Sequence, residues 1–240
     1  MPLSSYRKLS LVMNFVFGLG PRRVLDVGCG WGTYGWLCRQ YLDPAFSGAG
    51  GEDTPRPEII GVEVFERYRN PIWELAYDDV VIGDAVDVVP TLGSFDLVLL
   101  CDVIEHLSKD AGLRLLDALL SRSPCVLVSS PLGEMEQDAL FDNEAERHLS
   151  AWTRRDFAAY HTVYRECPLG FVVLVSRDPV RKGVAASTHP WALAKLAVRA
   201  TLPKPLVGAL RALLWPFRRL RRIATGGCRT RPEAPADADG

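Results

Sequence analysis

The stretch Val24-Leu-Asp-Val-Gly-Cys-Gly-Trp-Gly-Thr-Tyr-Gly35 decides the fold of this chain. A hydrophobic strand that carries Asp26 runs into Gly28, Gly30 and Gly32, and a helical pattern follows. Glycines suit such a turn because the backbone bends sharply there and a ligand approaches it with no Cβ in the way. The helix that follows offers free N–H groups and the positive end of its dipole. The stretch therefore predicts a ligand-binding turn between a strand and a helix.

Further apolar, β-branched runs recur along the chain, with helical patterns or loops between them. Runs that are apolar at every position are typical of strands buried on both faces, as in a parallel sheet covered by helices. The alternation of strands and helices predicts an α/β, doubly wound fold. The predicted strands cover residues 23–27, 58–64, 79–82, 95–101, 125–129 and 171–176, and an amphipathic helix is predicted over residues 9–19.

Charge is spread unevenly over the 240 residues, which suffice for one α/β domain and a small extension. Residues 1–180 hold 16 basic and 26 acidic side chains, whereas residues 181–240 hold 12 and 3. We predict a folded domain at residues 1–180 and a basic, amphipathic helical extension at residues 181–223. Residues 224–240 are rich in Thr, Gly, Pro, Ala and Asp, and they predict a disordered tail.

The six cysteines are scattered and form no Cys-x-x-Cys pair, so they predict reduced core thiols and neither a zinc site nor a disulfide framework. No run is long and uncharged enough to span a bilayer, for which about 20 apolar residues are needed. We therefore expect a cytoplasmic protein. The cysteines are Cys29, Cys38, Cys101, Cys125, Cys167 and Cys228.

The stretch from Val24 to Gly35 resembles the first motif of the class I S-adenosylmethionine-dependent methyltransferases, in particular their type 11 and type 23 domains. The resemblance implies a Rossmann-like, mostly parallel, seven-stranded sheet and S-adenosylmethionine as the cofactor. It implies that the loop of Gly28, Gly30 and Gly32 cradles the methionine part, with Asp26 close to the cofactor's amino group. The charges agree, because the cofactor carries an ammonium and a sulfonium but no phosphate, and a carboxylate attracts such cations.

The next two strands carry further motifs of that family. Glu63 ends a run of apolar residues, and the resemblance gives it the role of accepting from both ribose hydroxyls. Asp84 would accept from the adenine amino group, while the N–H of Ala85 would meet a ring nitrogen. The alternatives are a solvated carboxylate at a strand end for Glu63 and an ordinary Gly-Asp turn at Asp84.

The run from Phe95 to Leu107 resembles the fourth strand of the broad methyltransferase family that includes the ubiquinone-pathway enzymes. The resemblance implies that Cys101 and Asp102 lie beside the methyl-donor sulfur and that His106 lies at the opening of the next helix. An imidazole titrates near neutral pH, so His106 is a candidate catalytic base for an acceptor hydroxyl. The alternative is that His106 only packs and forms hydrogen bonds while proximity and orientation drive the reaction.

Residues 144–153 resemble a segment of methyltransferases that act on small molecules and glycans, and they place a second candidate base, His148, on the acceptor side. Some relatives, including small-RNA methyltransferases, bind a divalent ion through an acidic residue, a Glu-His pair and a distant His. Asp102, Glu105, His106 and His148 reproduce that outline, and such an ion would lower the pKa of an acceptor hydroxyl. Those relatives have Glu at the position of Asp102. The Asp side chain is shorter and reaches less far, so we expect no metal.

Residues 189–222 contain an apolar stripe at helical spacing that is edged with arginines. Such a helix suits an anionic membrane surface, at the inner face of the membrane, although Pro216 interrupts it. Docking on the chain's own domain or on a second subunit is an equal alternative. Nucleic acid is disfavoured as a partner, because no RNA-binding module accompanies the arginines and residues 1–180 are acidic. The sequence leaves the oligomeric state open.

These motifs predict an enzyme that transfers a methyl group from S-adenosylmethionine to an acceptor oxygen, or less favourably a nitrogen, of a small molecule, glycan or lipid-linked sugar. A nicotinamide-dependent oxidoreductase is one alternative, because Gly30-x-Gly32-x-x-Gly35 matches the dinucleotide fingerprint. The register of that match is poor, since the strand ends at Val27 and the turn comes before the fingerprint. A non-catalytic cofactor-binding or scaffold protein of the same fold is the other alternative.

Overall fold

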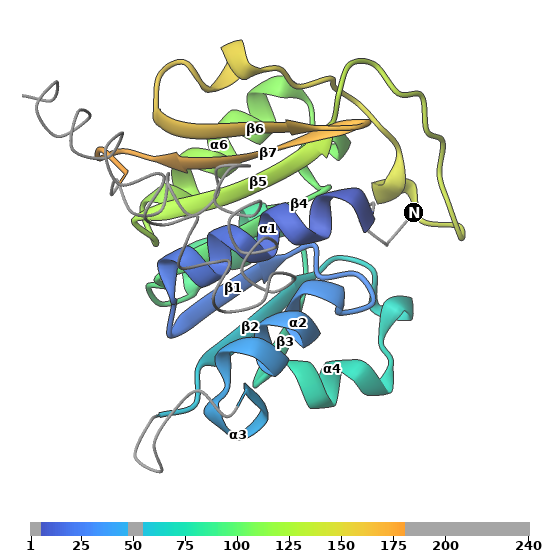
Figure 1. Ribbon diagram of the computed structural model, residues 1–240. Coiled ribbons are helices and arrows are strands. Elements are labelled where there is room, and N and C mark those ends of the chain that lie inside the picture. Colours follow the sequence, from blue (N-terminus) through green and yellow to red (C-terminus); the bar gives the residue numbers. More distant parts are fainter. Residues whose placement is uncertain (1–5, 48–54, 181–240) are drawn as a thin grey trace, which may run out of the picture. The chain divides into compact units, whose positions relative to one another are not determined.

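A single seven-stranded sheet forms the centre of the computed structural model, which describes residues 6–47 and 55–180 (Figure 1). The strands are β1 (Arg23–Val27), β2 (Glu58–Glu63), β3 (Asp79–Ile82), β4 (Leu97–Cys101), β5 (Cys125–Pro131), β6 (His161–Cys167) and β7 (Gly170–Ser176). Their order across the sheet is β3-β2-β1-β4-β5-β7-β6. The first five strands are mutually parallel, and β7 runs antiparallel to both β5 and β6. The predicted doubly wound α/β fold with a mostly parallel sheet is confirmed.

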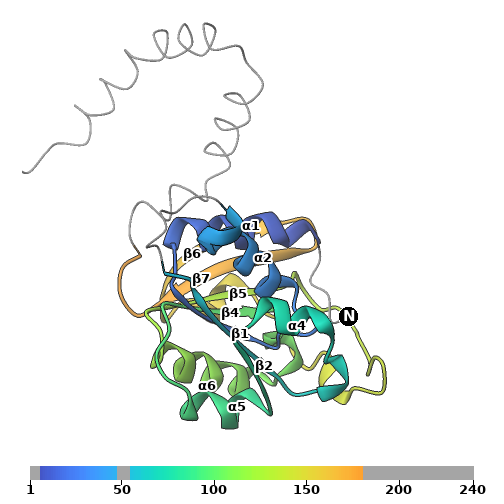
Figure 2. The same cartoon turned by 90° about the horizontal axis from the view of Figure 1, so that it is seen from below.

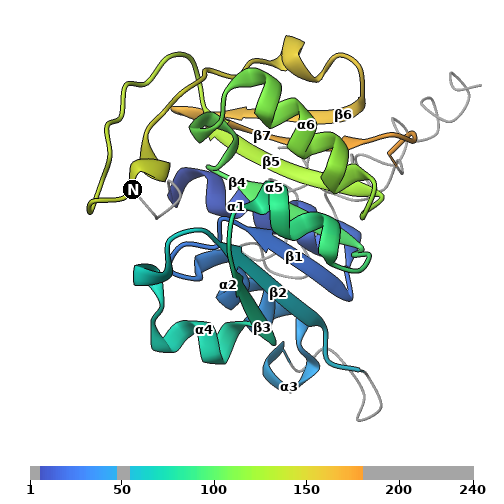
Figure 3. The same cartoon turned by 180° about the vertical axis from the view of Figure 1, so that it is seen from behind.

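Helices cover both faces of this sheet, as Figures 2 and 3 show. On one face α1, α2 and α4 pack into a hydrophobic cluster centred on Phe15, Cys38 and Trp73. On the other face α6 packs into a second cluster centred on Leu116 and Trp152. The helices are α1 (Tyr6–Leu19), α2 (Thr33–Leu42), α3 (Pro44–Ser47), α4 (Pro71–Ala76), α5 (Ala85–Val88) and α6 (Lys109–Leu120), and the 3-10 turns are η1 (Glu66–Tyr68), η2 (Val89–Thr91), η3 (Ile104–His106), η4 (Glu144–Glu146) and η5 (Arg154–Phe157).

The central strands are apolar at nearly every position because both of their faces are covered. In the middle of the sheet Leu25 pairs with Ile60 of β2 on one side and with Val98 of β4 on the other. β4 begins at Leu97, two residues later than predicted. Asp96 instead uses its carboxylate to accept from the backbone N–H groups of Arg22 and Arg23. The parallel register brings the carboxyl ends of β1 to β4 to one edge.

β6 was not identified from its residues, although the family resemblance implied seven strands. It is one of the two edge strands, and it pairs only with β7. Its sequence His161-Thr-Val-Tyr-Arg-Glu-Cys167 has polar residues at most positions, and only Val163 is buried. A half-solvated strand of this kind lacks the continuous apolar run that marks a strand buried on both faces.

The other local predictions about helices and cysteines are confirmed in part. The predicted helix at residues 9–19 begins earlier, at Tyr6. The prediction that His106 opens the next helix is wrong, since neither Glu105 nor His106 belongs to α6. They form the separate turn η3, because Ser108 caps α6 by accepting from the N–H of Ala111. Cys29, Cys38, Cys101 and Cys125 are buried free thiols, as predicted.

The predicted basic extension at 181–223, the tail at 224–240, the proposed contact segment 189–222 and Cys228 all lie outside the described residues. Within the described residues, none of the helices has the length and apolar character needed to cross a membrane.

Candidate active site

A pocket of about 170 Å³ opens at the edge where β1, β2, β3 and β4 end. This is the edge at which doubly wound sheets bind ligands. Of the site residues predicted from the sequence, eight line the pocket: Gly28, Gly30, Glu63, Asp84, Ala85, Cys101, Asp102 and His106. Three do not line it: Asp26, Gly32 and His148. The strand ends thus gather motifs that lie up to 78 residues apart in the chain, between Gly28 and His106.

The glycine loop is fixed to the neighbouring strand. The backbone N–H groups of Gly28 and Cys29 donate to the carbonyl of Val62, at 2.8 and 3.1 Å. Gly28 has a φ of +67°, and a Cβ at this position would lie 2.4 Å from Cγ2 of Val103. Both the backbone angle and the close approach of Val103 therefore require glycine at position 28.

Glu63 is a buried carboxylate at the end of β2. Its Oε2 accepts from the N–H of Gly30 at 2.8 Å, and its Oε1 accepts from the N–H of Phe65 at 3.0 Å. Burial raises the pKa of Glu63, and these two N–H groups oppose that rise by stabilising the charged form. Each oxygen keeps a lone pair, so the fixed carboxylate is suited to accept from two adjacent hydroxyls.

Asp84 and Ala85 lie together where β3 passes into α5. The Asp84 carboxylate accepts from the N–H of Val86 at 2.8 Å and so caps this four-residue helix. The Gly-Asp turn considered from the sequence is therefore present. Asp84 and Ala85 also line the pocket, so the capping and the predicted adenine contacts are compatible. Those contacts stay a prediction.

Asp26 lies under the glycine loop, where it is nearly inaccessible to solvent. Its Oδ2 accepts from the hydroxyl of Tyr77 at 2.7 Å. Burial raises the pKa of Asp26 to about 7, against the opposing effect of the Tyr77 hydrogen bond. The structure thus gives Asp26 a partner within the protein, and its predicted nearness to the cofactor's amino group stays a prediction.

The raised pKa of Asp26 has a consequence for stability. Between the unfolded value of 3.8 and about 7, the folded state binds more protons than the unfolded state at this carboxyl. The free energy of unfolding should then decrease as the pH rises through this window, by up to ~1.4 kcal/mol per pH unit from this group. We expect Asp26→Asn to flatten the decrease between pH 5 and pH 7, since the amide oxygen still accepts from Tyr77. Urea unfolding of both proteins at several pH values measures this, and parallel pH profiles would contradict it.

Cys101 and Asp102 end β4 at the pocket. Burial raises the pKa of the Cys101 thiol well above its usual range, so this side chain is neutral and has no nucleophilic thiolate. Asp102 has a backbone φ of +57°, an angle that residues other than glycine rarely adopt. Its Oδ1 accepts from the Ser129 hydroxyl at 3.3 Å and forms an ion pair with Lys8 of α1. Two strands and a helix thereby hold Asp102 at the pocket.

Lys8 was missed by the sequence reasoning, although a signal was present. It lies one helical turn before the buried Val12, with Phe15 one further turn along the same face. A lysine on the apolar face of an amphipathic helix is exceptional, because a buried charge requires a partner. That helical spacing would have predicted a buried acidic partner for Lys8.

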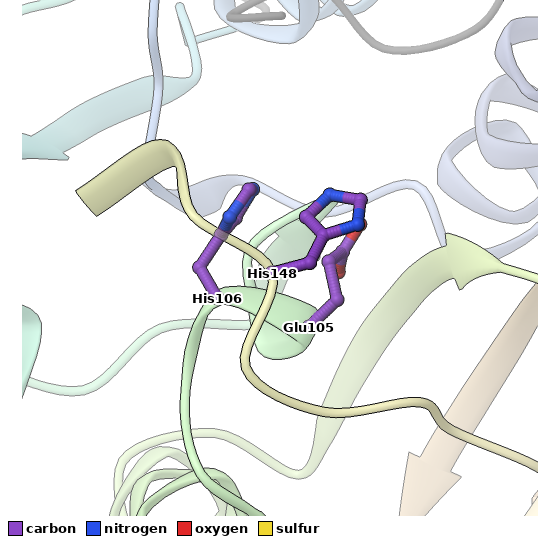
Figure 4. Close-up of side chains that lie close together, drawn as sticks. All are labelled: Glu105, His106 and His148. Carbon is purple, nitrogen blue, oxygen red and sulfur yellow. The ribbon is translucent and has the colours of Figure 1, made fainter. Parts of the chain in front are cut away.

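His106 and His148 face each other with ring centroids 4.9 Å apart, and Glu105 lies beside them (Figure 4). Nδ1 of His106 lies 3.2 Å from the carbonyl of Arg147, and Nδ1 of His148 lies 2.6 Å from that of Met135. A carbonyl only accepts, so each Nδ1 donates its proton to that carbonyl. Of the two rings, His106 also lines the pocket.

The electrostatics around this pair favour a neutral imidazole. Burial lowers the pKa of His106, and the nearby His148 lowers it further. Burial also raises the pKa of Glu105 to about 8, and the negative charge of Asp102 adds to the rise. At neutral pH His106 is thus free to accept a proton, while the Glu105 carboxyl retains one.

The four-residue outline of a metal site is only partly assembled. One ligand atom each from Glu105, His106 and His148 lie within 4.8 Å of one another. Asp102, the fourth member, is paired with Lys8 and Ser129 instead. The cluster that converges therefore has three members, and the ammonium of Lys8 already pairs with the carboxylate that would be the fourth.

A second feature missed from the sequence is a polar contact at the pocket between residues that lie far apart in the chain. The Tyr68 hydroxyl donates to Oε1 of Glu146 at 2.8 Å, and Nδ2 of Asn143 donates to the Tyr68 oxygen at 3.4 Å. All three residues line the pocket. The sequence placed residues 144–153 on the acceptor side, whereas η4 also reaches Glu63, whose pKa the charge of Glu146 raises. This one segment therefore reaches both Tyr68, through Asn143 and Glu146, and His106, through His148.

Neither a protein-family model nor a curated protein matches the chain. Solved structures do. An O-methyltransferase family protein from Burkholderia thailandensis aligns over 72% of this chain and 57% of its own, with a TM-score of 0.53 and 12% identity. A putative O-methyltransferase from Nostoc punctiforme aligns over 71% and 56%, with a TM-score of 0.51 and 19% identity. The bifunctional kinase-methyltransferase WbdD aligns over 76% and 42%, with a TM-score of 0.52 and 19% identity.

The matched part of this chain corresponds to about half the length of those three structures. At such identities the likeness concerns the arrangement of the backbone. The observed order β3-β2-β1-β4-β5-β7-β6, the glycine loop after β1 and the acidic residue that ends β2 agree with the sequence motifs. The chain has the fold of the class I S-adenosylmethionine-dependent methyltransferases.

Proposed function

We propose that this protein is an S-adenosylmethionine-dependent methyltransferase that acts on an acceptor hydroxyl. The observation that carries the proposal is the position of Glu63. Its buried carboxylate is hydrogen-bonded to the N–H of Gly30, so the ribose acceptor and the glycine loop form one rigid unit. Asp84 and Ala85 extend the same pocket toward the predicted adenine position, and Asp102 lies at its other end.

The charge of the pocket supports this cofactor over a nicotinamide dinucleotide. Glu63, Asp84, Asp102 and Glu146 line it, and no lysine or arginine occurs among the described residues of its lining. A diphosphate would meet repulsion there, while a sulfonium and an ammonium would be attracted. The same argument favours an acceptor without phosphate groups near the reacting atom, such as a hydroxyl of a small molecule or glycan.

The two histidines supply the proton chemistry. S-adenosylmethionine, when bound, supplies a methyl group on a sulfonium, and displacement by the acceptor oxygen leaves the electron pair on sulfur. His106 borders the pocket and its Nδ1 donates to a carbonyl, so Nε2 of the neutral ring accepts the proton that the acceptor hydroxyl releases. His148 packs against His106 and restricts its ring. Orientation of the acceptor by these groups provides the rest of the rate enhancement.

Calorimetric binding tests the cofactor assignment. We expect S-adenosylhomocysteine to bind the purified protein with a dissociation constant in the micromolar range, and NADH to give no saturable heat. Binding of NADH alone would instead support the oxidoreductase alternative. Binding of S-adenosylhomocysteine without transfer of a labelled methyl group to any hydroxyl acceptor in a broad screen would support the non-catalytic alternative.

A further inference from the structure

The active-site end of the sheet contains a buried cation that the proposed reaction does not use. Lys8 comes from α1, far from the other site residues in sequence, and its ammonium pairs with Asp102. The side chain is almost inaccessible to solvent. Its stem passes close to the backbone of β7, since a Cβ at Gly170 would lie 3.1 Å from Cδ of Lys8. Both the ammonium and the outer part of the stem of Lys8 therefore have close neighbours.

The surroundings of Lys8 have the composition of a cation site. Asp102 and Glu105 are two carboxyl groups in the space of one turn, and Oδ2 of Asp102 and Oε2 of Glu105 are buried with no hydrogen-bond partner. One ring nitrogen each of His106 and His148 lies within 4.8 Å of a carboxyl oxygen of Glu105 and of each other. Carboxylate oxygens and neutral imidazoles are ligands that divalent transition-metal ions prefer, and an ion that binds Glu105 would displace its proton.

A fixed ammonium changes the affinity of this cluster for a second cation. It neutralises the Asp102 carboxylate, and at short range in a buried site it also repels a divalent ion. Loss of that ammonium would leave Asp102 buried and uncompensated, which is costly unless another cation enters. The pairing partner of Asp102 thus determines whether the cluster needs a metal ion.

We propose that Lys8 is a positioning residue that acts as the built-in cation of this site and keeps the cluster of Asp102, Glu105, His106 and His148 free of divalent metal. These four residues are of the types that bind a metal ion, and the ammonium of Lys8 on α1 takes the place of that ion. The acceptor would then meet His106 as a base and not as a metal ligand. Only this last step rests on the proposed function.

Titration with Mn²⁺, followed by the electron paramagnetic resonance signal of the free ion, tests the proposal without any turnover. We expect the wild-type full chain to show no saturable binding up to about 1 mM. Lys8→Met keeps the length of the stem and removes the charge, and it should bind Mn²⁺ at least 10-fold more tightly than the wild type. Adding Asp102→Asn to Lys8→Met should abolish the gain, because the uncompensated carboxylate is gone.

Two further variants locate the effect. His148→Ala in the Lys8→Met background should also remove the gained binding, and Lys8→Arg should behave as the wild type does, since it keeps the charge. If Lys8→Met does not fold, Lys8→Gln replaces it, because the amide still donates to Asp102. Tight Mn²⁺ binding by the wild type, no gain on removal of the charge, or a gain that survives His148→Ala would each overturn the proposal. Failure of cofactor binding would affect only the proposed function.

Discussion

Glu63→Ala should raise the dissociation constant for S-adenosylhomocysteine by about 100-fold or more. The carboxylate is held by two backbone N–H groups, so its free lone pairs are already oriented when the cofactor arrives. Two charge-assisted hydrogen bonds to ribose hydroxyls, at roughly 1.5 kcal/mol each, account for about 3 kcal/mol. That energy corresponds to about 100-fold in affinity. Calorimetry measures the change, with circular dichroism to verify the fold.

Glu58→Ala is the matched control for Glu63→Ala. Both glutamates belong to β2, but Glu58 lies at its other end, where it pairs with Arg23 in a half-exposed ion pair. A surface pair of this kind contributes little to stability, and Glu58 does not line the pocket. Cofactor affinity should be unchanged in Glu58→Ala. Equal effects of the two substitutions would show that Glu63 acts through the strand and not through the ligand.

Gly35→Ala should destabilise the fold by roughly 3 kcal/mol or more, although alanine is the better helix former. A Cβ at position 35 would lie 2.1 to 2.4 Å from the ring carbons and hydroxyl of Tyr77. Tyr77 is buried and its hydroxyl donates to Asp26, so the ring has no free space to move into. For a domain of this size the melting temperature should fall by about 6–12 °C. Thermal unfolding followed by circular dichroism measures the change.

Gly93→Ala provides the comparison for Gly35→Ala. A Cβ there would lie no closer than 3.6 Å to any neighbour, in ordinary van der Waals contact with Arg23. We expect a change of the melting temperature within about 2 °C for this variant. If Gly35→Ala proved as stable as Gly93→Ala, the close contact between Tyr77 and Gly35 of α2 would be contradicted.

The sequence predicted the parts of the fold that depend on local patterns. Mostly apolar runs identified β1, β2, β4 and β5, because burial on both faces leaves few polar positions. β6 escaped, since its register with β7 is set by pairing at the sheet edge and not by its own hydrophobicity. Strand limits differed by up to two residues, as at β4, which begins after Asp96 because that carboxylate accepts from backbone N–H groups before β1.

The candidate site was predictable to the extent that its residues stand next to a strand end. Gly28, Glu63 and Asp84 follow directly from the motif positions, and the structure brings them to one pocket. Long-range pairs were not predictable in this way. The Lys8–Asp102 pair joins residues 94 positions apart, and the Tyr68–Glu146 pair joins residues 78 apart. Local spacing indicates that a buried Lys8 needs an acidic partner. Which residue becomes that partner depends on tertiary packing, which local spacing does not determine.

The segment from Asn143 to His148 connects two events that a kinetic scheme would treat separately. Asn143 and Glu146 contact Tyr68 beside the proposed cofactor position, and His148 packs against His106 beside the proposed acceptor position. Six residues span the two positions, so a displacement at one end is transmitted to the other through a short, hydrogen-bonded backbone. For the proposed function we therefore expect the free energies of binding of cofactor and acceptor to be coupled, and substitutions at opposite ends of this segment to act non-additively.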